Sequence, residues 1–157
     1  MLFDEHVYKF MFAALQEAEA ALEQNEVPVG AVIVHKDRII GRGYNQVEKL
    51  KDPTAHAEMI AVTAASNHLG DWRLNECDIY VTLEPCVMCT GALLAARIRS
   101  IYFADYDPKF GACGSLYNIA EEGKYNHKIK TYSGIYSFES KELLKRFFSN
   151  IRKDNLN

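Results

Sequence analysis

Two short motifs, each expected at the start of a helix, constrain the fold of this chain more than any other feature. They are His56-Ala57-Glu58 and Pro85-Cys86-Val87-Met88-Cys89. Two cysteines spaced three residues apart in the first turn of a helix lie on one face, where unpaired backbone N–H groups favour the thiolate form that binds metals. The fold must bring two helix starts together if the histidine and the two cysteines are to form one metal site.

Hydrophobic periodicity predicts the elements around these motifs. Helices are expected at 4–25, 55–69, 86–96 and 137–151. Strands are expected at 29–34, 39–44, 78–83, 100–104 and near 128–132, and the first two should form a hairpin. Loops are expected at 46–54 and 105–115, and a short helical turn is expected at 116–120. Strands that alternate with helices after a hairpin predict a mixed sheet covered on both faces, a three-layer α/β/α sandwich.

Chain length and cysteine spacing indicate the class of protein. The 157 residues are enough for a single domain, 1–157, with its own core. The sequence has no apolar run near the roughly 18 residues of a membrane span, and its start is too polar for a signal peptide, so we expect a cytoplasmic protein with no membrane association. Uneven spacing of the four cysteines favours metal binding or free thiols over disulfides.

The charge distribution is uneven although the net charge is only −3. Residues 1–85 hold 7 basic and 14 acidic side chains, whereas residues 86–157 hold 11 basic and 7 acidic ones. The basic residues near the C-terminus are Lys141, Lys145, Arg146, Arg152 and Lys153. Two interpretations of this stretch are open, the solvated face of an amphipathic helix and a surface that faces RNA.

The number of available ligands separates two kinds of zinc site. A structural site takes four protein ligands, whereas a catalytic site takes three and leaves a position for water. The sequence has no second C-x-x-C and no H-x-x-x-H, which favours an open site of His56, Cys86 and Cys89 with one zinc per chain. A fourth ligand from Cys77 or Cys113 would instead indicate a structural zinc domain that is not an enzyme. A thioredoxin-like use of the two cysteines would leave the His-Ala-Glu triplet unexplained.

Glu58 is the candidate catalytic residue. In the first turn of a helix its side chain and that of His56 can both reach the space above the helix end. Beside a metal-bound water, a carboxylate there can collect a proton and deliver it to the substrate. The alternative is a carboxylate that only stabilises the helix start.

These motifs and the strings around them resemble the bacterial tRNA-specific adenosine deaminases, which are cytidine deaminase-like zinc deaminases. The resemblance is carried by 26–31, Asn45, 52–58, 72–74, 80–89, 114–116, 126–127 and 147–148. It implies a five-stranded mixed sheet between helices and a homodimer. It also implies a hydrolase that converts the wobble adenosine of a tRNA anticodon stem-loop to inosine, by zinc-activated water with Glu58 as proton shuttle.

The resemblance also implies how a purine would be held. Asn45 is positioned to hydrogen-bond the base, although a plain turn residue is an equally good interpretation of an asparagine at the end of a strand. By the same resemblance, Val29 and Ala57 shape the pocket.

Four further residues resemble positions that grip loop nucleotides in this family: Asn126, His127, Phe147 and Phe148. An aromatic pair near basic residues suits stacking on unpaired bases, and one of the two phenylalanines is expected in the core. An alternative function keeps the zinc chemistry but acts on a free base or nucleotide, of the guanine or deoxycytidylate type. The basic C-terminal half argues mildly against this alternative, because a small substrate needs no such surface.

Overall fold

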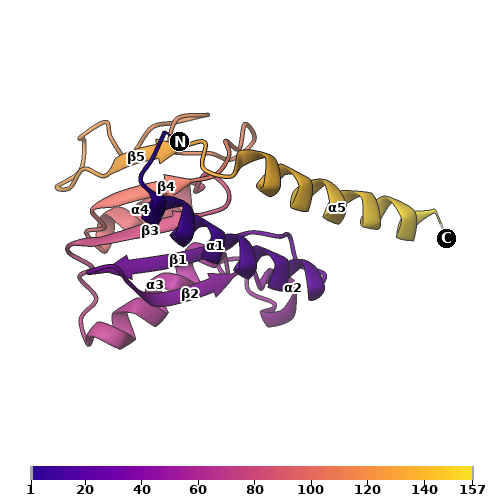
Figure 1. Ribbon diagram of the computed structural model, residues 1–157, viewed down its shortest axis with the longest axis horizontal. Coiled ribbons are helices and arrows are strands. Elements are labelled where there is room, and N and C mark those ends of the chain that lie inside the picture. The colour runs from indigo at the N-terminus through magenta and orange to yellow at the C-terminus, as the bar shows by residue number, and fades with distance from the viewer. Residues whose placement is uncertain (1, 157) are drawn as a thin grey trace.

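One five-stranded mixed sheet organises the computed structural model, which describes residues 2–156 (Figure 1). The strands are β1 (Gly30–His35), β2 (Arg38–Tyr44), β3 (Cys77–Val81), β4 (Ser100–Phe103) and β5 (Lys130–Ser133), in the order β2-β1-β3-β4-β5. β1 pairs antiparallel with both β2 and β3, whereas β3, β4 and β5 run parallel. The predicted hairpin and mixed sheet are confirmed.

Helices cover both faces of the sheet, as the three-layer prediction requires. They are α1 (Glu5–Glu23), α2 (Val47–Leu50), α3 (Ala57–Leu69), α4 (Val87–Ala95) and α5 (Ser137–Asn155). Side chains of β1 alternate between the faces: Val32 and Val34 pack with α1, whereas Ala31 and Ile33 pack with α3 and α4. α5 packs beside α1, where Leu143 meets Leu15. Among the described helices, none is both long and apolar enough to span a bilayer.

Two local predictions are wrong. Residues 46–54 are not all loop, because α2 forms a single turn there whose first amides are bound by the distant Glu26 carboxylate. Residues 116–120 are not a helical turn. Their amides bond back across the loop instead, from Leu116 to the Gly111 carbonyl and from Ile119 to the Ala112 carbonyl. Both outcomes depend on partners far away or on the opposite arm of the loop, which local periodicity does not register.

Strand directions gather several segments at one edge of the sheet. Because β1 is antiparallel to its neighbours, it begins at the edge where β2 and β3 end, and β4 ends there as well. Glycines then let α3 lie close against β2. A Cβ at Gly43 would fall 2.4 Å from the Ala57 carbonyl oxygen, so only glycine allows this approach. The start of α3 is thereby fixed at the edge where the strands converge.

Candidate metal centre and substrate cavity

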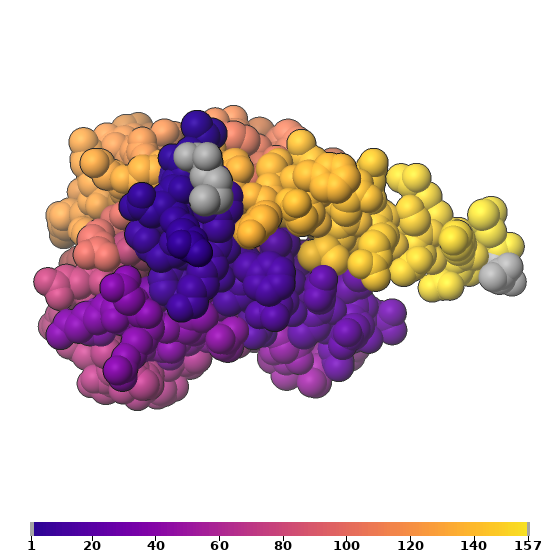
Figure 2. Space-filling view, viewed as in Figure 1, coloured from indigo at the N-terminus to yellow at the C-terminus, as the bar shows by residue number. Residues whose placement is uncertain are grey.

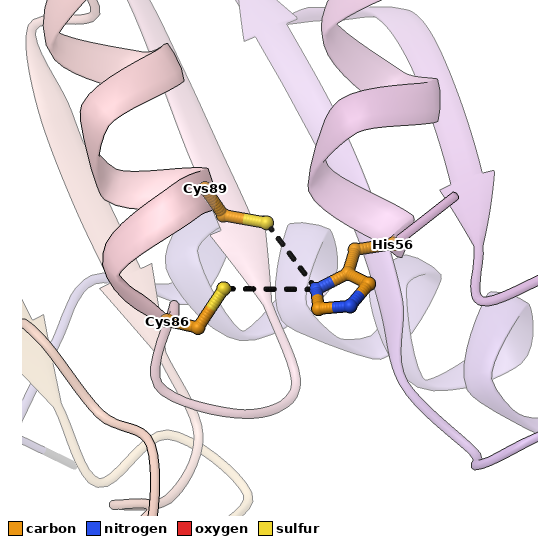
Figure 3. A group of neighbouring side chains, drawn as sticks. All are labelled: His56, Cys86 and Cys89. Carbon is orange, nitrogen blue, oxygen red and sulfur yellow. Dashed lines mark hydrogen bonds between the residues drawn. The ribbon is translucent and has the colours of Figure 1, made fainter. Parts of the chain in front are cut away.

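His56, Cys86 and Cys89 meet between the starts of α3 and α4 (Figure 3). His56 and Cys86 are the residues that precede the first helical residue, in extended backbone conformation, so both helices begin slightly later than the sequence predicted. His56 Nδ1 lies 3.7 Å from the Cys86 sulfur and 3.5 Å from the Cys89 sulfur. The three ligand atoms all lie within 4.8 Å of one another.

These separations fit a tetrahedral zinc ion. With Zn–S near 2.3 Å and Zn–N near 2.0–2.1 Å, a tetrahedral angle places the nitrogen about 3.6 Å from each sulfur. The observed distances of 3.5 and 3.7 Å from His56 Nδ1 bracket that value. One imidazole nitrogen and two thiolates are also ligands that zinc prefers. The residues present therefore fit zinc, with three protein ligands rather than four.

The other two cysteines are engaged elsewhere. The Cys77 thiol faces the Asn75 carbonyl at 3.6 Å, and the Cys113 sulfur lies 3.4 Å from the Thr90 hydroxyl. Neither belongs to the one group of potential metal ligands found among residues 2–156. This arrangement favours the open site over the four-ligand structural site.

The two cysteines of the group differ in the pKa of their thiols. Hydrogen bonds from the Cys89 thiol and from His56 lower the pKa of Cys86 to about 4. The same hydrogen bond to Cys86, together with burial, raises the pKa of Cys89. The thiolate form, which is the form that binds metal, is therefore favoured at Cys86 over Cys89.

Glu58 lies in the first turn of α3, two residues after His56, and is 4% exposed. Burial raises the pKa of its carboxyl group above the ordinary value, and the charge of Cys86 raises it further. A carboxyl group that holds a proton more readily is suited to general acid and base chemistry near neutral pH.

A cavity of about 540 Å³ opens beside this group. Its walls come from the segment before β1, the segment after β2, the start of α3, the β3–α4 turn, the loop 105–115 and one residue of α5. A cavity of this size is typical of sites for small molecules or single nucleosides. The strand ends that converge at this edge therefore build the site from segments remote in sequence.

Four of the residues predicted to bind substrate line this cavity: Val29, Asn45, Ala57 and Phe147. Asn45 is 8% exposed; its Nδ2 donates to the Val27 carbonyl, and its Oδ1 accepts from the Val47 amide. Phe147 is 9% exposed, whereas its neighbour Phe148 is 49% exposed and packs edge-on against it.

Asn126 and His127 lie elsewhere. They line a second groove, along the exposed side of α4, which shares Val87 with the main cavity. His127 Nε2 lies 2.6 Å from the Ile98 carbonyl oxygen. Within the described chain these two residues do not line the main cavity, and their predicted part in RNA binding stays a prediction.

Two buried carboxylates in the cavity wall were given no role by the sequence analysis. Glu26 is 1% exposed and accepts hydrogen bonds from the amides of Glu48 and Lys49. Glu84 is 3% exposed and binds the loop 105–115. The sequence signal for both is a carboxylate directly beside an apolar run, where burial is expected. A charge buried in this way requires hydrogen-bonding partners.

Comparison with known proteins gives consistent matches over most of the chain. The model of the cytidine and deoxycytidylate deaminase zinc-binding region matches residues 4–105. The tRNA-specific adenosine deaminase of Aquifex aeolicus (strain VF5) is 46% identical over 145 residues, which cover 92% of this chain and 95% of the relative. That of Bacillus subtilis (strain 168) is 42% identical over 144 residues, 92% of this chain and 89% of the relative.

Solved structures agree. A structure from work on A-to-I editing by tRNA:A34 deaminases at the wobble position of transfer RNA superposes with a TM-score of 0.83 at 45% identity. It covers 87% of this chain and 99% of that chain. A guanine deaminase from Bacillus subtilis superposes with a TM-score of 0.63 at 31% identity, over 83% of this chain and 85% of that chain.

Metal analysis of purified variants tests the three-ligand site. We expect zinc near one per chain for the wild type, and loss of most of it when Cys86 or Cys89 is replaced by serine, because two remaining ligands hold zinc poorly. Cys77→Ser and Cys113→Ser are the matched controls and should keep full zinc content, measured by plasma mass spectrometry. Zinc loss in either control would indicate a fourth sulfur ligand.

Proposed function

Because this chain belongs to the tRNA-specific adenosine deaminases of the cytidine and deoxycytidylate deaminase zinc-binding family, we propose that it converts adenosine to inosine at the wobble position of a tRNA anticodon. The observation that carries this proposal is identity above 40% over nearly the whole length of such enzymes, joined to a zinc-compatible group beside a buried carboxyl group.

The reaction requires controlled movement of protons. Hydrolytic deamination adds water at C6 of the purine and releases ammonia, so a proton passes from the water to ring N1 and another to the leaving amine. Zinc held by His56, Cys86 and Cys89 supplies the Lewis acidity that lowers the pKa of the attacking water. Glu58 carries the protons, because it lies in the cavity wall beside His56 and its buried carboxyl group has a raised pKa.

The purine is held by Asn45, Val29 and Ala57, which line the cavity. Asn45 uses one N–H and one acceptor position of its amide to fix the backbone of Val27 and Val47. An amide has a second N–H and a second lone pair on its oxygen, and these are free to bind the polar edge of a base. Val29 and Ala57 supply apolar surface around it. Asn45 therefore serves both as a turn residue and as a substrate ligand.

The anticodon stem-loop is bound along α5. Phe147 faces the cavity, Phe148 is exposed next to it, and the basic residues of the helix are all exposed. Figure 2 shows the C-terminal part of α5 projecting beyond the rest of the molecule, so that it can follow a nucleic-acid backbone. Aromatic stacking on unpaired bases with cations facing phosphates is the usual way in which proteins bind single-stranded RNA loops. Asn126 and His127 contact further loop nucleotides from the groove along α4.

Three further expectations accompany the function. We propose that the chain acts as one domain, 1–157, since the two larger hydrophobic clusters pack on opposite faces of a single sheet. A tRNA substrate and reduced thiol ligands suit the cytoplasm. The enzyme is proposed to be a homodimer, because Val87, Gly91 and Ala95 form an exposed apolar stripe at helical spacing along α4. Asn126 and His127 line the same groove, so their proposed RNA contacts would be made at the rim of the dimer interface.

The test of the function is inosine formation on a panel of short hairpin RNAs with adenosine at the wobble position. We expect the wild type to be active, and Glu58→Gln to lower turnover by roughly 10²–10⁴-fold because the proton carrier is lost. Zinc content should be unchanged, and Glu19→Gln, an exposed carboxylate on α1, is the control and should keep full activity.

Two results would contradict this assignment. A zinc-loaded wild type that deaminates free guanine or deoxycytidylate faster than it deaminates any hairpin RNA would favour the alternative function. A guanine deaminase has a similar fold, so this alternative is tested directly. Turnover by Glu58→Gln within a few-fold of the wild type would remove Glu58 from the chemistry.

Phe147→Ala tests the stacking role. A lost base contact should raise the KM for hairpin RNA by about tenfold or more, since stacking on one aromatic side chain contributes about 1–3 kcal/mol. Phe138→Ala removes a phenylalanine from the same helix that is 69% exposed and does not line the main cavity, so its KM should equal that of the wild type. Thermal unfolding is followed in parallel, and an unchanged KM in Phe147→Ala would argue against stacking.

Ala95→Glu tests the homodimer. A charge within an apolar interface should shift the protein from twice the chain mass to the chain mass in light scattering after gel filtration. Asn67→Glu, on the exposed side of α3, is the control and should leave the mass unchanged. A wild type that elutes as a monomer at every concentration would refute the proposed assembly.

A further inference from the structure

Glu84 has no role in the proposed reaction, yet its carboxylate is buried and accepts four hydrogen bonds. It lies in the turn between β3 and α4, two residues before Cys86, and is 3% exposed. Its Oε1 accepts hydrogen bonds from the Asp107 amide at 3.0 Å and from the Ser115 hydroxyl. Its Oε2 accepts from the Cys113 amide at 2.9 Å and from the Ser115 amide at 3.0 Å.

All of these donors belong to one loop, 105–115. An ionised carboxylate offers about four acceptor positions and no donor, so the loop uses the full capacity of the Glu84 side chain. The donors come from both arms of the loop. The loop has no regular hydrogen-bonded ladder of its own, and among residues 2–156 Glu84 is the one side chain outside it that binds amides on both of its arms.

The same loop is attached to the turn that carries a metal ligand. The Ala112 amide donates to the Pro85 carbonyl at 2.9 Å, and Gly111 forms an isolated β-bridge with Cys86. Gly111 also lies directly over the carboxylate: a Cβ built there would fall 2.2 Å from Glu84 Cδ. A glycine is required here by the close approach of the two segments.

The outer side of the loop forms part of the cavity. Asp107 and Phe110 line the cavity wall, and Phe110 is 67% exposed at its mouth. Val87 is 59% exposed and lines the same cavity. The position of this wall is set by where the loop is held, and the loop is held by the Glu84 carboxylate together with its backbone contacts to Pro85 and Cys86.

We propose that Glu84 is a positioning residue: its buried carboxylate fixes the loop 105–115 against the metal-ligand turn, and so places Asp107 and Phe110 as a wall that contacts the RNA around the target base. This inference rests on the proposed function, because it assigns part of the RNA-binding surface. Glu84 is not one of the potential metal ligands, and its oxygens are occupied by the loop donors.

The first variant is Glu84→Gln, which keeps the shape of the side chain. An amide retains one carbonyl oxygen and turns an NH2 group towards N–H donors, so about half of the loop contacts are lost. We expect the KM for hairpin RNA to rise about tenfold, the effect of one or two lost hydrogen bonds, with kcat within about threefold of the wild type. Zinc content should stay near one per chain.

The control is Glu121→Gln. Glu121 also accepts a backbone amide and a hydroxyl, both from Thr131, at 2.7 and 2.8 Å, but it does not line the main cavity. The same chemical change there should leave both kinetic constants unaltered. A purely structural role of Glu84 would instead lower the fraction of active enzyme, which reduces kcat and leaves KM unchanged.

A second variant, Gly111→Ala, displaces the loop from the other side. Its added methyl group collides with the Glu84 carboxylate, so KM should rise as in Glu84→Gln.

A measurement on the wild type tests the same contacts even if the variants do not fold. The amides of Cys113 and Ser115 should exchange with deuterium much more slowly than exposed loop amides, such as those of residues 123–126.

The outcomes separate the two proposals. Unprotected Cys113 and Ser115 amides, or folded Glu84→Gln and Gly111→Ala with wild-type KM, would overturn the positioning role while leaving the deaminase assignment intact. A wild type inactive on every hairpin would overturn the function itself. A raised KM in both variants with normal zinc content, unchanged kcat and an unaffected Glu121→Gln would establish the positioning role.

Discussion

The alignment of two helix starts at one edge of the sheet is the constraint on which the rest of the structure depends. α3 is reached from the end of β2 and α4 from the end of β3, and both strands end at this edge because β1 runs antiparallel between them. The two helices then run back side by side on one face. Their N-terminal ends, with unpaired amides that favour thiolate, are thereby brought to within ligand distance of a single ion.

Three buried carboxyl groups line the cavity, those of Glu26, Glu58 and Glu84, and they differ in their hydrogen-bonding partners and therefore in their roles. Glu26 binds the first amides of α2 and Glu84 binds the loop 105–115, so each closes one wall by accepting hydrogen bonds on its oxygens. Glu58 lies beside the metal group, and burial raises the pKa of its carboxyl group. Two walls of the cavity are therefore held in place by buried carboxylates, because each accepts hydrogen bonds from backbone amides of the segment that it fixes.

The sequence predicted the sheet, its flanking helices and the metal group because each has a local signature. Apolar periodicity indicated the elements, and the two motifs indicated the three ligands at helix starts. The failures share one physical cause, which is dependence on distant partners. α2 forms because Glu26 binds its amides, and residues 116–120 bond across their own loop. The contacts of Glu84 depend in the same way on a loop that follows it in the chain, and neither periodicity nor composition encodes such a pairing.

The exposure of α5 bears on the two interpretations that the sequence left open for its basic residues. An amphipathic helix that served only the core would bury its apolar side along its whole length, but this helix buries Leu143 and Phe147 and is exposed from Phe148 to its end. Figure 1 shows that end extending away from the sheet. A cationic segment without a packing partner in the described chain, continuous with a phenylalanine that faces the cavity, is poorly explained as a core element. An extended anionic ligand that inserts one base into the cavity would engage both parts of the helix at once.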